Sequence, residues 1–95
     1  MAAYVIVDEE ITDPQRFDEY RRLAGATLAA HGASFLVRGG NPETLEGDWR
    51  PKRMVVIQFE SAEQARAWYH SPEYQAAVAA RQGAAVLKFV LAEGV

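Results

Sequence analysis

Two histidines are the first side chains in this sequence that could move a proton near neutral pH. His31 lies at the end of a helical pattern and precedes a glycine, so a charged ring there would be stabilised by the carbonyl end of the helix. The same ring could instead accept a proton at the edge of a pocket. We favour the structural role for His31, and we expect His70, at a junction between helical segments, to be solvated.

Two arginines are candidates for holding an anion. Arg38 ends an apolar segment directly before a Gly-Gly pair, where a guanidinium beside bare backbone could hold a carboxylate or a phosphate. The alternative that we favour is an internal ion pair with Glu46 across a hairpin, which would order the turn. Arg81 has the same two options, a pocket cation or an ion-pair partner for Glu73 or Asp8.

Three aromatic side chains from consecutive helical segments, Trp68, Tyr69 and Tyr74, are the remaining candidates. Aromatic residues at helical spacing more often belong to a core than to a ligand site. Buried tyrosine hydroxyls still need hydrogen-bond partners, so a pocket with a polar rim remains an alternative. Trp49 falls in a turn-rich segment, and we expect it to pack on a second copy of the chain.

The composition argues against several classes of site. The chain has no cysteine and its histidines lack metal-ligand spacing, so we expect neither a metal nor an organic cofactor. Ten Lys and Arg residues against thirteen Asp and Glu residues, with no basic stripe, argue against nucleic acid and an anionic membrane surface. The first residues lack the basic start and apolar core of a signal peptide, and no apolar run approaches about 20 residues. We therefore expect a cytoplasmic protein.

The elements that position these side chains form a single predicted domain, residues 1–95. A capping residue followed by proline, or by glutamine three positions later, marks each helix start, and glycine marks two helix ends. Short apolar runs between these signals predict strands. The predicted helices follow Asp13, Ser61 and Ser71, and the predicted strands are Tyr4–Val7, Ser34–Arg38, Arg53–Phe59 and Val86–Leu91.

The order of these elements is β-α-β-β-α-β with an extra helical segment, which is the plan of the α+β ferredoxin-like fold with a four-stranded antiparallel sheet. Because its helices cover one face only, such a sheet should alternate apolar and polar residues. The predicted strands do not alternate: Val5 and Val7 point one way, and Tyr4 and Ile6 point the other way. We therefore predict a homodimer in which a second copy covers the bare face, sheet against sheet.

Several motifs resemble those of the uncharacterised DUF1330 family, a group within the dimeric α/β-barrel superfamily of ferredoxin-like domains. The similarity runs from Tyr4 to the C-terminus, and its most specific part is the block from Trp68 to Gln75. The resemblance implies a dimer with face-to-face sheets and implies no activity. The motifs are Arg38-Gly39-Gly40, Leu45-Glu46-Gly47, the strand ending at Phe59, and Trp68-Tyr69-His70-Ser71-Pro72-Glu73-Tyr74-Gln75 with Arg81.

Three functions are consistent with these residues. The first, which we favour, is binding of a small metabolite, an anionic one included, in a cleft between sheet and helices. Its candidate ligand residues are Arg38, Glu46, Trp68 and Arg81. The second, suggested by superfamily relatives, is a cofactor-independent monooxygenase, isomerase or lyase, with His31 as base, Arg38 as anion holder and Tyr69 or Tyr74 as hydrogen-bond donor. The third is a purely structural dimerisation module.

Overall fold

All three helices begin at the predicted caps. In the computed structural model, which describes residues 1–95, the side chains of Asp13, Ser61 and Ser71 each accept a hydrogen bond from the backbone N–H three residues later, at 3.1–3.2 Å. No helix has both the length and the apolar character needed to cross a membrane. The helices are α1 (Pro14–Ala30), α2 (Ala62–Tyr69) and α3 (Pro72–Ala80).

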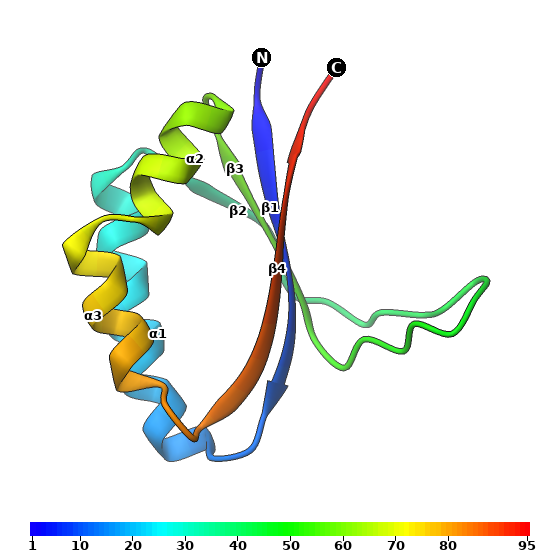
Figure 1. Ribbon diagram of the computed structural model, residues 1–95. Coiled ribbons are helices and arrows are strands. Elements are labelled where there is room, and N and C mark those ends of the chain that lie inside the picture. The colour runs from blue at the N-terminus through cyan, green and yellow to red at the C-terminus, as the bar shows by residue number, and fades with distance from the viewer.

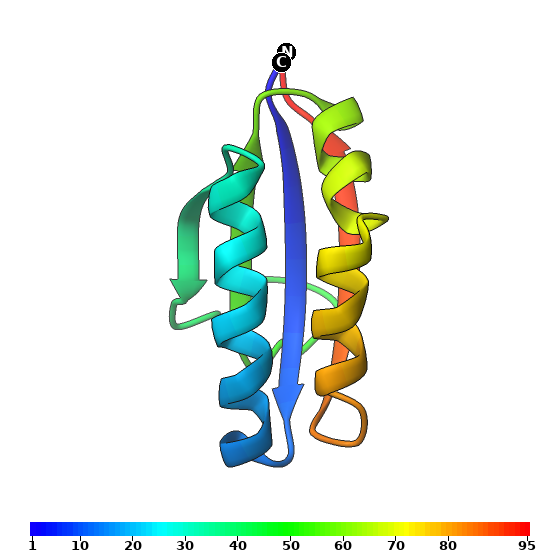
Figure 2. The ribbon, with the colours of Figure 1, turned by 90° about the vertical axis from the view of Figure 1, so that its left-hand side faces the viewer.

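The four strands form one antiparallel sheet in the order β2-β3-β1-β4. Figures 1 and 2 show two layers, with α1 lying beside the α2–α3 pair on the same face of the sheet. This arrangement confirms the predicted α+β ferredoxin-like fold. The strands are β1 (Ala3–Ile11), β2 (Ser34–Gly39), β3 (Met54–Phe59) and β4 (Ala85–Glu93).

Strand β1 extends four residues beyond the predicted end at Val7. Its polar second half stays paired with β4, where Asp8 lies opposite Lys88 and Glu9 lies opposite Leu87. The prediction stopped at the first acidic residue, although backbone pairing continues wherever a neighbouring strand is present. As a result, Glu9 occupies a strand position that faces the helices and is buried.

The sheet has apolar side chains on both faces, as the lack of alternation indicated. Val5 and Val7 face the helices and are buried in the core. Val86 and Val90 lie on the opposite face and are 59% and 60% exposed in the single chain. We call this opposite surface the outer face; its apolar members are Tyr4, Ile6, Val37, Met54, Val56, Val86 and Val90.

An extended segment of residues 40–53, called the arm below, joins β2 to β3 without helix or strand. Figure 1 shows the arm projecting from the sheet on the side away from the helices. Within the chain, the Trp49 indole N–H donates to an Asp8 carboxylate oxygen at 2.8 Å, and Trp49 stays half-exposed. The predicted contact of Trp49 with a second copy stays a prediction.

The two ends of the chain lie side by side (Figure 1), because β1 and β4 are neighbouring strands. Ala3 lies opposite Glu93, and the Gly94 N–H donates to the Ala2 carbonyl at 2.8 Å.

Candidate functional site

A cavity of about 280 Å³ lies between α1 and the helix-facing side of the sheet. Its interior is apolar, with Val7, Val55 and Ile57 from the sheet and Leu28 from α1. Small residues on α1 leave the space open, since a Cβ added at Gly25 would meet no atom within 4 Å. A glycine inside a helix costs about 1 kcal/mol relative to alanine, so α1 keeps this opening at some cost in stability.

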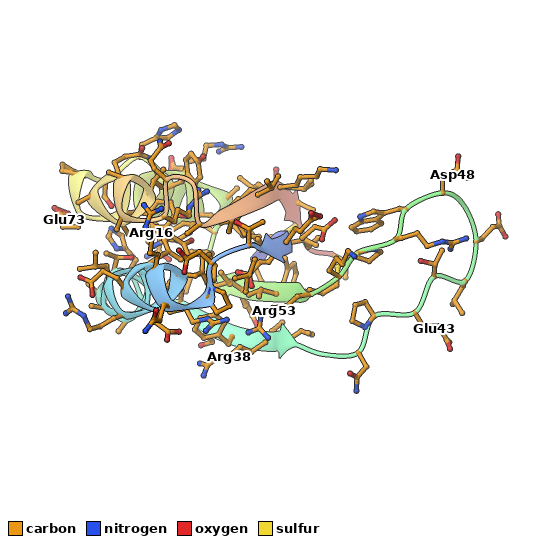
Figure 3. The ribbon with its side chains drawn as sticks, turned by 90° about the horizontal axis from the view of Figure 1, so that it is seen from below. Arg16, Arg38, Glu43, Asp48, Arg53 and Glu73 are labelled. Carbon is orange, nitrogen blue, oxygen red and sulfur yellow. The ribbon has the colours of Figure 1, made fainter.

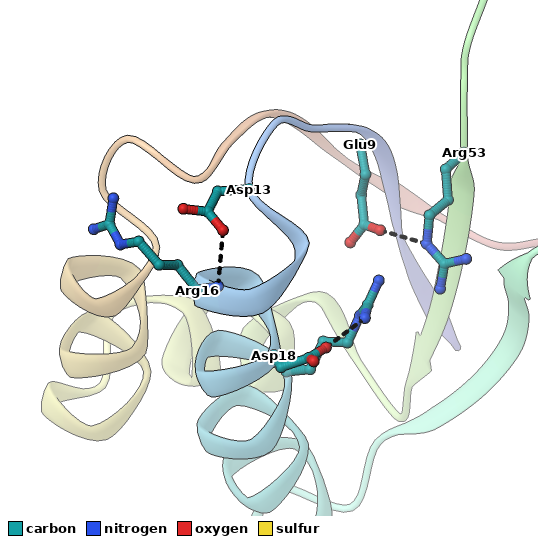
Figure 4. A network of polar contacts seen from close by, with 6 residues as sticks. Glu9, Asp13, Arg16, Asp18 and Arg53 are labelled. Carbon is teal, nitrogen blue, oxygen red and sulfur yellow. Dashed lines mark hydrogen bonds and ion pairs between the residues drawn. The ribbon is translucent and has the colours of Figure 1, made fainter.

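Charged side chains gather at one end of the cavity: Arg21 from α1, Arg38 from β2, Arg53 from the end of the arm, directly before β3, and Glu9 from β1. The Arg53 Nε donates to the Glu9 carboxylate at 2.8 Å (Figure 4), and Glu9 is nearly buried. Arg21 pairs with Asp18, one turn earlier on α1, at 2.8 Å. Two of the three guanidinium groups, those of Arg21 and Arg53, are therefore paired with a carboxylate.

Arg38 is the remaining guanidinium, and it forms no ion pair. Its Cζ lies 4.1 Å from the centroid of the Phe35 ring, on which the guanidinium stacks. Arg38 lies on β2, and Arg53 directly precedes the neighbouring strand β3 (Figure 3). Arg38 lies opposite Val55, on the side of the sheet that lines the cavity. Arg38 is thus a cation at the charged end of the cavity that has no ion-pair partner and makes a cation–π contact with Phe35.

The expected ion pair between Arg38 and Glu46 is not formed. Arg38 faces the helices, whereas Glu46 lies in the arm, which leaves the sheet on the opposite side. The guanidinium beside the Gly-Gly turn belongs to Arg53 instead. Gly39, with φ of 95°, leaves the space that this guanidinium occupies, since a Cβ at Gly39 would collide with it.

A buried pair of tyrosines lies behind the charged end of the cavity. The hydroxyls of Tyr20, which lines the cavity, and Tyr74, which belongs to the core, are 2.7 Å apart; we call them the tyrosine pair. Burial raises the pKa of Tyr20 well above its ordinary value, and the charge that Tyr74 would carry if ionised raises it further. Burial also raises the pKa of Tyr74. Both hydroxyls are therefore protonated in the folded protein at any physiological pH.

Arg81 lies against this pair and not against the carboxylates expected for it. Its guanidinium is 5.2 Å from the centroid of the Tyr20 ring and 5.7 Å from that of Phe89, and it forms no ion pair with Glu73 or Asp8. Its positive charge opposes the rise in the pKa of Tyr74. Its Nε is buried without a hydrogen-bond partner.

The remaining candidates divide between the cavity wall and places outside it. Trp68 lines the cavity and is also core, with its indole N–H donating to the Thr27 hydroxyl at 2.9 Å. Tyr69 packs at the edge of the core, outside the cavity lining. His31 also lies outside the lining, with its Nδ1 2.9 Å from the Thr27 carbonyl oxygen. Ligand and catalytic roles for these residues stay predictions.

Four residues in or behind the charged end were not singled out from the sequence: Glu9, Tyr20, Arg21 and Arg53. A signal for Glu9 was present, because it follows Val5 and Val7 at the spacing of two that places side chains on one face of a strand. No comparable signal links Glu9 to Arg53, which lies 44 residues away.

The fold and this cavity define a ferredoxin-like domain with a partly open, mainly apolar cavity between its first helix and its sheet. The chain belongs to the family described as a domain of unknown function (DUF1330), whose model matches residues 2–95. No curated protein matches its sequence.

Solved structures with the same fold come from several bacteria. A protein of unknown function from Rhodopseudomonas palustris is 18% identical, with a TM-score of 0.78, over 99% of this chain and 82% of that one. A dimeric ferredoxin-like protein of unknown function from Thermobifida fusca is 16% identical, with a TM-score of 0.64, over 99% and 92%. SnoaB, a cofactor-independent oxygenase from Streptomyces nogalater, is 13% identical, with a TM-score of 0.62, over 99% and 92%. At these identities the similarity shows the fold alone.

Proposed function

We propose that this chain binds a small molecule with an apolar body and an anionic group in the cavity between α1 and the sheet. The observation that carries the proposal is Arg38, an unpaired guanidinium at the charged end of an otherwise apolar space. A ligand site with an apolar wall and a few polar groups at one end is the usual form of a small-molecule pocket.

The charge at this end favours an anion over a cation. Three guanidinium groups and the Glu9 carboxylate leave an excess of positive charge among the residues that line the cavity. Arg38 keeps its donors available, and its guanidinium packs over the Phe35 ring, with Cζ 4.1 Å from the ring centroid. A planar guanidinium matches a carboxylate through two parallel hydrogen bonds, so a carboxylate is the ligand group that we propose.

We propose further that two copies pair through the outer face. Support comes from the exposed valines of β4 and the apolar residues of β1 and β3 on that face, which the helices do not cover. The descriptions of several structures with this fold as dimeric also support it. Covering a face of this kind typically buries on the order of 2,000 Å² in total. The cytoplasmic location expected from the sequence stays a prediction.

Titration calorimetry with benzoate and benzamide tests the ligand proposal. The two probes share the ring and differ in charge, so we expect benzoate to bind and benzamide to bind weakly or not at all. Arg38→Gln should lower benzoate affinity by about tenfold to hundredfold, the range for a hydrogen-bonded charge. Arg22→Gln is the matched control, because it removes an equal charge from a side chain of α1 that does not line the cavity.

Equal binding of the two probes, or an equal loss of affinity in the two variants, would contradict a carboxylate site at Arg38. Native mass spectrometry of protein purified from its own cells would then identify any retained ligand directly. The cavity supports ligand binding over a purely structural module. A catalytic role has less support, since His31, the expected base, lies outside the cavity lining.

A further inference from the structure

The tyrosine pair has one more proton than it has acceptors within the protein. Each hydroxyl carries one proton, and the single hydrogen bond between Tyr20 and Tyr74 uses one of them. Neither hydroxyl donates to any other side chain or to a backbone carbonyl. One of the two hydroxyls therefore points a proton at a place where the protein supplies no acceptor.

Arg81 decides which hydroxyl has the free proton. A guanidinium is a donor only and is always charged, so it repels a hydroxyl proton and attracts the lone pairs of the oxygen. The charge of Arg81 opposes the rise in pKa of both tyrosines, but only at Tyr74 does Arg81 also act as a hydrogen-bond donor that lowers the pKa. The Tyr74 oxygen therefore turns its lone pairs toward Arg81, and its proton lies between the two tyrosine oxygens. Tyr74 donates, Tyr20 accepts, and the proton of Tyr20 is free.

The free proton of Tyr20 belongs to a residue that lines the cavity. The Glu9 carboxylate, which lines the same cavity, acts on the Tyr20 hydroxyl through its charge, but no hydrogen bond joins the two. We infer that Tyr20 donates a hydrogen bond to an oxygen of the bound molecule and selects ligands with an acceptor, such as a carbonyl, in addition to the anionic group. This inference rests on the ligand cavity proposed above.

Two features make Tyr20 a strong donor. It accepts a proton from Tyr74, and a hydroxyl that accepts one hydrogen bond becomes a better donor in the next. Burial keeps both tyrosines protonated, so the donor is present throughout the physiological pH range. A site built to hydrogen-bond a ligand oxygen discriminates against an analogue that lacks it, because the buried donor is then left without a partner.

Matched probes test the inference. 3-Acetylbenzoate and 4-acetylbenzoate each carry a carboxylate and a ketone, and their isopropenyl counterparts replace the ketone oxygen by a CH₂ group of similar shape. We expect the wild-type protein to bind at least one acetyl probe about fivefold to tenfold more tightly than its counterpart, the range for one neutral hydrogen bond. Tyr20→Phe should abolish this preference.

Tyr69→Phe is the control variant, since Tyr69 lies outside the cavity lining, and it should keep the preference in full. Tyr74→Phe should reduce the preference without abolishing it. No preference in the wild-type protein for either acetyl probe, or a preference that survives Tyr20→Phe, overturns the inference. Failure of all benzoates to bind would instead count against the proposed function.

A measurement without ligand separates these failures. In NMR spectra of tyrosine-labelled protein, the slowly exchanging hydroxyl proton between the two rings should correlate with the ring carbons of Tyr74. The same proton correlated with Tyr20 would reverse the direction of the hydrogen bond and overturn the inference, whether or not any probe binds.

Discussion

The ion pair between Glu9 and Arg53 should respond unequally to loss of its two partners. The Glu9 side chain is 10% exposed and the Arg53 side chain is 33% exposed, at a separation of 2.8 Å. Arg53→Met leaves a nearly buried carboxylate without a partner, which should cost about 3 kcal/mol of the free energy of unfolding. Glu9→Gln leaves a guanidinium that can turn toward water, so its cost should be nearer about 1 kcal/mol.

Thermal unfolding followed by circular dichroism, at one fixed protein concentration, measures both costs. For a domain of this size 1 kcal/mol shifts the midpoint by roughly 4–8 °C, so Arg53→Met should lower it by roughly 12–24 °C and Glu9→Gln by about a third of that. The double variant should be less destabilised than the sum of the two, because it buries no unpaired charge. Arg22→Met, which breaks the exposed pair with Glu19, should have little effect.

The reasoning is refuted if Glu9→Gln costs more than Arg53→Met, or if the two costs simply add in the double variant. Either result would mean that the pair is not what orders the charged end of the cavity. Loss of benzoate binding in Arg53→Met alone would not decide the question, because the variant could displace neighbouring side chains.

Three further predictions concern the turn, the outer face and the tyrosine pair. In urea unfolding, Gly39→Ala should destabilise the fold by more than Gly47→Ala. Both glycines have φ near 95°, so both variants suffer the same backbone strain, but only at Gly39 would the added Cβ also collide with the Arg53 guanidinium. Equal costs of about 1–2 kcal/mol in the two variants would mean that backbone strain is the whole effect. Val90→Glu should sediment as a monomer while the helix-surface variant Ala76→Glu sediments as a dimer, and a dimeric Val90→Glu protein would exclude the outer face as the interface. Stability should fall above about pH 10, because the unfolded chain then releases tyrosine protons that the folded protein retains. The slope should be steeper than in the variant with both tyrosines of the pair replaced by phenylalanine. Tyr20 alone should contribute about 1.4 kcal/mol per pH unit, and equal slopes would contradict the raised pKa values.

The elements of this fold could be predicted because their signals are local. A capping side chain such as Ser71 contacts backbone only three residues away, and Pro72 and Gly83 restrict or permit conformations at their own positions. The lack of alternation in the strands is also a local pattern, and it correctly indicated two apolar faces. The end of β1 was missed because Asp8 and Glu9 are held by pairing with β4, which is distant in sequence.

The charged end of the cavity could not be predicted in the same way. Arg38 and Glu46 are close in sequence and were paired on that basis, yet the turn after Gly39 sends them to opposite sides of the sheet. Arg53 directly precedes β3, and Glu9 lies on β1. The two side chains are paired because β3 and β1 are neighbouring strands in the sheet. A side-chain pair of this kind can be predicted only after the register of the strands is known.

The adjacency of the two chain ends makes this domain suited to circular permutation. A short glycine-serine linker could join the ends, which the hydrogen bond from Gly94 to Ala2 already holds together, and new ends could be opened in the arm. Exposed segments without helix or strand tolerate such a break best. The permuted chain would enter the sheet at β3, and β2 would become the last strand to be made. Since β2 supplies Arg38 to the cavity, a ligand would then be held by a segment that folds at the free end of the chain.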